Sequence, residues 1–304
     1  MTALAFDVGG TKLAAATVGD HGALLDPVNV PTPPSGVWEA AAALLRSVAG
    51  ARTVTSIGIA SAGPVDSTTG TVSPINIAEW ASGFGLTAAV RALFPEARVN
   101  LIVDGAAAAL GEAKRGAGRG TPDLLSVVLS TGIGGGLVLG GRVVTGRSGN
   151  AGHIGHMTSI YGVDQCACGA TGCIETVASG PAAVRWARAH GWSGRDAVAL
   201  CADAAAGDRT ATTALERAGT ALGQVLASAA ALTDVGLVVV GGGFSQAGPP
   251  LWGPMQASVA RYGRLSFVRD LRIVPAELGP LGTLTGAAVL AATPTLLRPV
   301  RTLP

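Results

Sequence analysis

Two stretches of the chain repeat one order of apolar runs and glycine-rich turns. The runs are Leu4–Val8, Leu13–Val18 and the residues after Gly22 in the first stretch, and Leu125–Leu129, Leu137–Leu139 and Arg142–Val144 in the second. Short apolar runs bounded by such turns are typical of β-strands. The pattern therefore predicts an internal duplication of a three-stranded unit, with one copy in each lobe.

The segment between the two copies alternates helical and extended patterns. Residues Val37–Val48 predict a helix, and Ser56–Ala60 predict a strand. Val99–Val103 are apolar enough for a further strand, and Asp104 opens an alanine-rich helix directly after it. Strands that alternate with helices indicate an α/β fold.

The chain after the second copy is mostly helical in pattern. The clearest helix is Thr213–Leu232, whose apolar positions follow the spacing of one buried stripe. These positions are Leu215, Ala218, Leu222, Val225, Ala229 and Leu232. A strand over Gly236–Val240 leads into a further glycine turn. A last helix at Leu284–Ala292 is expected to cross back to the first lobe.

Length and composition favour a two-lobed enzyme. The 304 residues are 48% hydrophobic and 13% charged, with 45 glycines, which suits an α/β protein with a large core and tight turns. We expect an N-terminal lobe over residues 1–117, joined by a C-terminal helix at about 284–304, and a C-terminal lobe over 118–283. The glycine-rich turns at 115–122 are candidate hinge segments.

Charge and cysteine content exclude several classes of protein. The net charge is +2 without a run of basic residues, so no nucleic-acid partner is expected. No apolar stretch reaches the length of a membrane span, and the N-terminus has no basic segment of a signal peptide. Three cysteines crowded at 166–173 are poorly placed to bridge one another, so we expect a reduced, cytoplasmic protein.

Three glycine-rich loops follow apolar strands. They are DVGGT at 7–11, STGIGGG at 130–136 and VGGGF at 240–244. Glycine lets backbone N–H groups approach phosphate oxygens, and Asp7 could hold Mg²⁺ through hard oxygen ligands. Any one such loop is more often a plain hairpin turn, and the Walker and GxGxxG patterns are missing. Three together favour phosphate binding between two lobes.

One histidine and three cysteines are grouped tightly along the chain. His156, Cys166, Cys168 and Cys173 are soft ligands that suit a closed, tetrahedral, structural zinc site. The alternative is a set of buried small residues with a core histidine. Because a four-ligand zinc leaves no open position, we expect it to hold the loop that carries His153 and Glu175. Cys201 stands alone and is expected in the core.

Five motifs in order along the chain resemble the ROK family of bacterial sugar kinases. They are DVGGTK, GIASAGPV, STGIGGG, the stretch from GHIGH through CACGATGCIE to ASG, and VVVGGG. The resemblance implies a two-lobed actin-like ATPase (ribonuclease H-like) fold with a structural zinc loop. It also implies ATP and Mg²⁺ as cofactors and a homodimer. Where many ROK kinases have glutamate, this chain has His153, a variant similar to kinases of N-acetylmannosamine.

The resemblance assigns a role to individual positions. Asp104 is the implied general base that takes the proton of the sugar 6-hydroxyl; its alternative is a helix N-cap. The implied sugar contacts are Gly63, Asn76, His153, Glu175 and, besides its zinc role, His156. The implied contacts with ATP phosphates are Asp7, Gly9, Gly10, Thr11, Lys12, Thr131 and Gly132, and those with the adenosine are Gly241 and Gly242.

One departure from the family concerns the sugar. Val103 stands where the family usually has an asparagine that contacts a sugar hydroxyl. Losing one neutral hydrogen bond costs about 0.5–1.5 kcal/mol, which can shift the preferred sugar without removing the base. The favoured activity is 6-phosphorylation of N-acetyl-D-mannosamine, with a glucokinase or another hexose kinase as the alternative.

Two other classes of protein agree less well with the sequence. A non-catalytic sugar-binding regulator conflicts with the presence of Asp104, Thr131 and both phosphate loops. A DNA-binding repressor of the same family is expected to need a helix-turn-helix before the first phosphate loop, which here begins at Asp7. For the kinase, we expect the two lobes to close over sugar and ATP and to exclude water.

Overall fold

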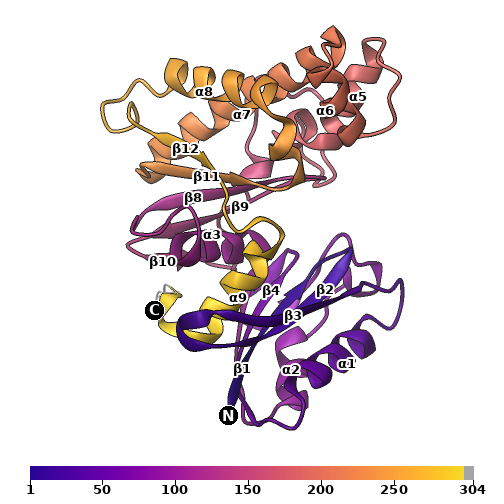
Figure 1. The fold of residues 1–304 in the computed structure, drawn as a ribbon, viewed down its shortest axis with the longest axis vertical. Helices are drawn as coiled ribbons and strands as arrows, with labels where there is room; N and C mark the ends of the chain where they lie inside the picture. The colour runs from indigo at the N-terminus through magenta and orange to yellow at the C-terminus, as the bar shows by residue number, and fades with distance from the viewer. Residues whose placement is uncertain (298–304) are drawn as a thin grey trace. The chain divides into compact units, whose positions relative to one another are not determined.

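The computed structural model describes residues 1–297, and the chain divides into two compact units (Figure 1). The first unit comprises residues 1–122, 136–152 and the chain from Glu277 onward, and the second comprises residues 123–135 and 153–276. The part of the expected C-terminal helix that falls at 298–304 lies outside the described residues. Among residues 1–297, no helix combines the length and the apolar character needed to cross a membrane.

Each of two five-stranded sheets is built on the same plan. The first sheet has the order β3-β2-β1-β4-β7, and the second has the order β10-β9-β8-β11-β12. The strands of the first sheet are β1 (Thr2–Val8), β2 (Lys12–Val18), β3 (Leu24–Pro31), β4 (Val54–Ser61) and β7 (Arg98–Val103). In the second they are β8 (Leu124–Leu129), β9 (Ile133–Leu139), β10 (Arg142–Val144), β11 (Leu237–Gly241) and β12 (Arg272–Pro275).

The matching strand orders confirm the duplication that the apolar pattern predicts. In the first sheet, β1 pairs antiparallel with β2 and parallel with β4. In the second, β8 pairs parallel with β11, as β1 does with β4, and β9 pairs antiparallel with β10, as β2 does with β3. A small third sheet joins β5 (Val65–Asp66) and β6 (Thr71–Val72).

The helices of the first unit pack on its sheet. They are α1 (Val37–Ala49), α2 (Leu86–Leu93), α3 (Asp104–Arg115) and α9 (Gly282–Ala292), with the short η1 (Asp20–Gly22), η2 (Ala78–Trp80), η5 (Gly279–Leu281) and η6 (Pro294–Leu296). Helix α9 lies against β1 and β4, and α3 packs along α9. The predicted helices at 37–48 and 284–292, and the one that opens at Asp104, are therefore confirmed to within one or two residues.

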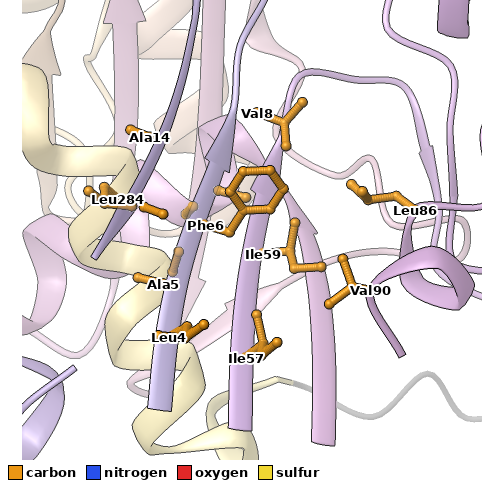
Figure 2. Close-up of a cluster of buried hydrophobic side chains, with 14 of the residues drawn as sticks. Leu4, Ala5, Phe6, Val8, Ala14, Ile57, Ile59, Leu86, Val90 and Leu284 are labelled. Carbon is orange, nitrogen blue, oxygen red and sulfur yellow. The ribbon is translucent and has the colours of Figure 1, made fainter. Parts of the chain in front are cut away.

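The side chains of β1 alternate between the two faces of the first sheet. Phe6 and Ile59 point toward Leu86 and Val90 of α2, whereas Ala5 lies on the side of Leu284 from α9 (Figure 2). The α9 side is built from small residues because that helix runs close to the sheet: a Cβ on Gly58 would lie 2.0 Å from the Ala287 carbonyl oxygen. Large side chains thus fill one face, and a closely packed helix covers the other.

The second unit carries the remaining helices. They are α4 (Glu175–Ala178), α5 (Gly180–Ala189), α6 (Ala197–Ala205), α7 (Arg209–Thr233) and α8 (Pro249–Tyr262), with η3 (Ile154–His156) and η4 (Gly243–Ala247). Helix α7 confirms the predicted helix at 213–232, and its long contact with α8 buries most of the predicted stripe. One position of the stripe is wrong: Leu232 lies in the last turn of α7 and is 83% exposed.

The predicted glycine loop at 130–136 also needs a correction. Only Ser130–Gly132 form a turn, because Ile133–Gly136 already belong to strand β9. Gly136 has a packing role instead: a Cβ there would lie 2.3 Å from the Gly105 carbonyl oxygen. Glycine there allows β9 to run directly against the beginning of α3.

Candidate active site

Two carboxylates stand at one edge of the first sheet. Strands β1, β4 and β7 are parallel, so their carboxyl ends lie at the same edge. Asp7 is the next-to-last residue of β1, and Asp104 follows the last residue of β7. The edge of this sheet therefore brings together the predicted phosphate-loop acid and the predicted base.

The surroundings of these acids favour their protonated forms. Asp7 is only 8% exposed, and loss of hydration, reinforced by the negative charge of Asp104, raises its pKa to about 7, although Lys12 opposes the rise. Desolvation also raises the pKa of Asp104, against the effect of a hydrogen bond from the Gly105 N–H. Two acids that are held in one region and resist ionisation are typical of a site that binds a cation or moves a proton.

The structure tests the helix-cap alternative for Asp104. A capping side chain accepts a hydrogen bond from an N–H two or three residues into its helix, as Ser179, Asp196 and Asp208 do for α5, α6 and α7. Asp104 is the first residue of α3, and among the described residues its carboxylate accepts only the N–H of Gly105, at 2.7 Å, so it makes no capping bond there. The N-cap interpretation is therefore wrong.

The first glycine loop is a hairpin turn that contacts a residue predicted to bind the sugar. The Gly9 N–H donates to the Lys12 carbonyl, at 3.0 Å, so this N–H is used by the turn that joins β1 to β2. A Cβ on Gly10 would lie 2.5 Å from the side-chain Cγ of Asn76, so glycine is needed for this contact. Thr11 is exposed, Lys12 opens β2, and Gly63 lies just beyond the end of β4.

In the second unit, Glu175 is held against the turn at 130–132. Its Oε2 accepts a hydrogen bond from the Ile133 N–H, at 2.7 Å. A Cβ on Gly132 would lie 2.6 Å from the same oxygen, which explains glycine at that position. The bond leaves Oε1 of Glu175 without a bonded partner among the described residues. Thr131, in the same turn, has an exposed side chain.

His153 lies beside this carboxylate. Its Nε2 atom is buried and has no hydrogen-bond partner among the described residues, which is uncommon for a buried polar atom. Desolvation, together with the nearby His156, lowers the pKa of His153, while Glu175 acts in the opposite direction. The ring is therefore neutral near pH 7, and its unpaired nitrogen can donate or accept one hydrogen bond.

The four predicted zinc ligands converge in the second unit. Their ligand atoms all lie within 4.8 Å of one another, with 3.7 Å between the Sγ atoms of Cys168 and Cys173. The Cys166 Sγ lies 3.8 Å from Nδ1 of His156. Tetrahedral zinc with bonds of about 2.3 Å places two sulfur ligands about 3.8 Å apart, so the cluster fits zinc.

The third glycine loop has a packing role. Gly241 ends β11, and Gly242 has a positive φ of 92°. A Cβ on Gly242 would lie 2.3 Å from the Leu129 carbonyl oxygen, so the neighbouring strand β8 alone requires glycine there. The structure thus supplies a reason for this glycine that is independent of the predicted adenosine contact.

A cavity of about 800 Å³ opens in the second unit beside the turn at 130–132. Its lining combines the turn with residues from α5, α6 and η4, among them Thr131, Val184, Arg185, Cys201, Phe244 and Gln246. Most of this lining could not be predicted from the sequence, because it combines segments that are spread between Ser130 and Gln246. Cys201, expected in the core, lies half-buried on this wall instead.

Comparisons with known proteins agree with this geometry. The family model described as "ROK family" matches residues 3–293. The chain is 37% identical to an N-acetylmannosamine kinase of Escherichia fergusonii, over 80% of this chain and 83% of that protein. It is 35% identical to the ROK hexokinase of Thermus thermophilus, whose crystal structure covers 97% of this chain and 99% of that one, with a TM-score of 0.87.

A second crystal structure is similar in the same way. The ROK family glucokinase of Streptomyces griseus, in complex with glucose and AMPPNP, is 32% identical over 96% of this chain and 99% of that one, with a TM-score of 0.80. The chain therefore belongs to the ROK family and has its actin-like ATPase fold. It is an ATP-dependent sugar kinase, which confirms the class predicted from the motifs.

Proposed function

We propose that this kinase transfers the γ-phosphoryl group of ATP to the 6-hydroxyl of N-acetyl-D-mannosamine. The observation that carries the choice of sugar is His153, a neutral imidazole with a buried, unpaired Nε2 next to Glu175. The similarity to an N-acetylmannosamine kinase at 37% identity supports the same choice. The activity belongs to amino-sugar breakdown.

The groups around His153 suit a sugar with several hydroxyls. Glu175 offers one carboxylate oxygen beyond its bond to Ile133, and His153 offers one nitrogen. Both side chains are held by the segment that begins at His153 and ends at Glu175, and this segment contains the whole Cys/His cluster. We propose that zinc in the cluster keeps the two sugar-binding groups in place, with Gly63, Asn76 and His156 as further sugar contacts.

In the first unit, we assign Asp104 as the general base. Its raised pKa brings its proton affinity closer to that of a hydroxyl group under attack, which favours proton transfer. Asp7 supplies the hard oxygen ligand that Mg²⁺ prefers, and the repulsion between the two acids makes a cation favourable there. Mg²⁺ bound at Asp7 would neutralise charge on the phosphates.

The nucleotide is assigned to the cavity of the second unit. Its volume of about 800 Å³ suits a nucleotide, and Thr131 at its rim can donate to a phosphate. The other predicted nucleotide contacts keep this role as a proposal; they are Gly9, Gly10, Thr11, Lys12, Gly132, Gly241 and Gly242. A homodimer in the cytoplasm completes the proposal, on the family resemblance alone.

A glucokinase is the second candidate, and a specific observation favours it. The hexokinase and glucokinase structures match 96–97% of the chain at 32–35% identity, more of its length than the N-acetylmannosamine kinase matches. Moreover, Val103 is 1% exposed and packs in the hydrophobic core, so it supplies no hydrogen bond for a sugar.

Replacing His153 by the glutamate that many ROK kinases have tests the assignment. We expect His153→Glu to lower the ratio of kcat/KM for N-acetylmannosamine over glucose by at least tenfold, because an anionic acceptor replaces a neutral ring. His21→Glu, the same change at an exposed histidine, should leave the ratio unchanged. Proton NMR of the product would show whether the phosphate sits on the 6-position. An unchanged ratio in His153→Glu would refute the role of His153.

A further inference from the structure

Helix α3 contains a second buried carboxylate that the proposed chemistry does not use. Glu112 is 2% exposed and lies two turns along the helix from Asp104. Its Oε2 accepts hydrogen bonds from the backbone N–H of Ala117, at 2.8 Å, and of Glu277, at 3.2 Å. Its Oε1 accepts one from the N–H of Leu278, at 2.9 Å. All of these residues belong to the first unit.

The position of Glu112 is unusual for an acid. It lies near the carboxyl end of α3, where the helix dipole disfavours negative charge. The three N–H donors compensate for this cost and for the loss of hydration. Two of them, at 277 and 278, directly precede η5 and α9, so the carboxylate joins the end of α3 to the segment that begins α9. Glu112 is thus a polar clamp between two helices.

Glycines bring α3 and its neighbours into direct backbone contact. A Cβ on Gly111 would lie 2.5 Å from the Gly282 carbonyl oxygen, and one on Gly286 would lie 1.8 Å from the Ala107 carbonyl oxygen. These contacts set how closely α3 approaches α9, but they carry no side-chain hydrogen bond. Glu112 adds the directional bonds that fix the position of α3 along α9.

We propose that Glu112 is a positioning residue for catalysis, since it holds α3 in the place that aligns Asp104 with the sugar hydroxyl. This inference rests on the proposed role of Asp104 as the base. Asp104 is the first residue of α3 and lacks a capping bond of its own, so its carboxylate moves with the helix. A displacement of about 1 Å in a reacting group can lower a rate about 100-fold.

Two variants disturb the clamp by different means. Glu112→Gln keeps the shape of the side chain and replaces one of its two acceptor oxygens by an NH₂ group, so at least one of the three N–H donors loses its acceptor. Gly116→Ala keeps the carboxylate but displaces it, because a Cβ on Gly116 would lie 2.0 Å from Oε2 of Glu112. Its φ is −116°, so alanine adds no backbone strain. Glu96→Gln, the same change at an exposed glutamate of the first unit outside the clamp, is the matched control.

The experiment compares kcat, the sugar KM and the thermal stability of five proteins: the wild type, the two single variants, their double variant and the control. All are measured at saturating Mg-ATP, with rates given per folded molecule. We expect Glu112→Gln and Gly116→Ala each to lower kcat at least tenfold with the sugar KM changed less than about twofold. The double variant should lose little more than either single one, because both break the same clamp. Glu96→Gln should match the wild type.

The outcomes separate this inference from the proposed function. Lower melting temperatures with an unchanged kcat per folded molecule would mean that Glu112 is structural only, and would overturn the inference. Asp104→Asn, measured alongside, tests the base itself and is expected to abolish turnover while sugar binding persists. If Asp104→Asn stays active, the base assignment fails; if it is inactive while both clamp variants keep full kcat, only the positioning role fails.

Discussion

Asp7 is a carboxyl group in a position that favours its protonated form. Three effects set this balance: burial and the charge of Asp104 raise the pKa of Asp7 to about 7, while Lys12 moderates the rise. A buried acid that is neutral at low pH and ionised at high pH costs the folded state stability when it ionises. This single residue therefore couples folding to pH.

The sign of the coupling follows from the two pKa values. The unfolded chain loses this proton near pH 3.8, and the folded chain keeps it up to about pH 7. Between these values the folded state binds more protons, so its stability falls as the pH rises, and the loss is complete above about pH 7. At 1.36 kcal/mol per unit of pKa shift, the change between pH 5 and pH 8 is of the order of 2 kcal/mol.

Asp7→Asn should remove this contribution. We expect the variant to gain stability relative to the wild type as the pH rises from 5 to 8 in buffer without Mg²⁺. Denaturant unfolding of both proteins at several pH values measures the difference. A stability difference that stays constant across this range would contradict the assigned pKa.

Single residues also show what the sequence could and could not predict. The members of the Cys/His cluster were predictable from the sequence, because cysteine and histidine have few other reasons to be grouped so closely. The partner of Glu175 was not, since its bond to the Ile133 N–H joins residues 42 apart in the chain. Glu112 gave no signal either, because only the fold brings the three N–H groups to it.

At the scale of elements, the segment from His153 to Glu175 is mostly irregular. It contains η3, and among the described residues its only strand-like pairing consists of two isolated β-bridges, Thr158–Cys173 and Gln165–Thr171. Backbone hydrogen bonds, such as those from Ser159 N–H to the Gly172 carbonyl and from Ile174 N–H to the Met157 carbonyl, hold parts of this loop. A metal bound in the Cys/His cluster would add a further constraint. The proposed sugar-binding groups flank the cluster at its two ends, and zinc would order both.

Removing one ligand tests the cluster. Cys168 is exposed, so Cys168→Ser changes the metal site without disturbing the core. We expect the variant to lose its zinc, measured by elemental analysis, and to bind N-acetylmannosamine at least tenfold more weakly by calorimetry. Cys201→Ser removes a thiol outside the cluster and should keep both zinc and sugar affinity. If elemental analysis finds no zinc in the purified wild-type protein, the assignment of the cluster as a zinc site is contradicted.

Strands and helices with a strong pattern were predictable, and short or exposed ones were not. Runs such as Leu4–Val8 and Leu13–Val18 are apolar on both faces because a helix or another layer covers each side of the sheet. Strand β12 has only four residues, none of them fully buried, and lacks such a pattern. The glycines at 134–136 resembled a loop in the sequence, because the packing of Gly136 against α3 is visible only in the fold.

At the scale of the whole molecule, one strand plan is used twice. Duplication explains why glycine turns recur after β1 and β8, the equivalent strands of the two sheets. In the first copy, the turn after β1 lies at the sheet edge that carries Asp7 and Asp104. In the second copy, the turn after β8 lies beside Glu175 and the cavity. The two copies thus place different side chains beside equivalent turns.

The sugar preference tests the account most directly. A coupled ADP-release assay with Mg-ATP would compare N-acetylmannosamine, N-acetylglucosamine, glucose, mannose and glucosamine under the same conditions. The account predicts the highest kcat/KM for N-acetylmannosamine, because neutral His153 replaces the glutamate found in many ROK kinases. A higher kcat/KM for glucose would contradict it and identify a glucokinase.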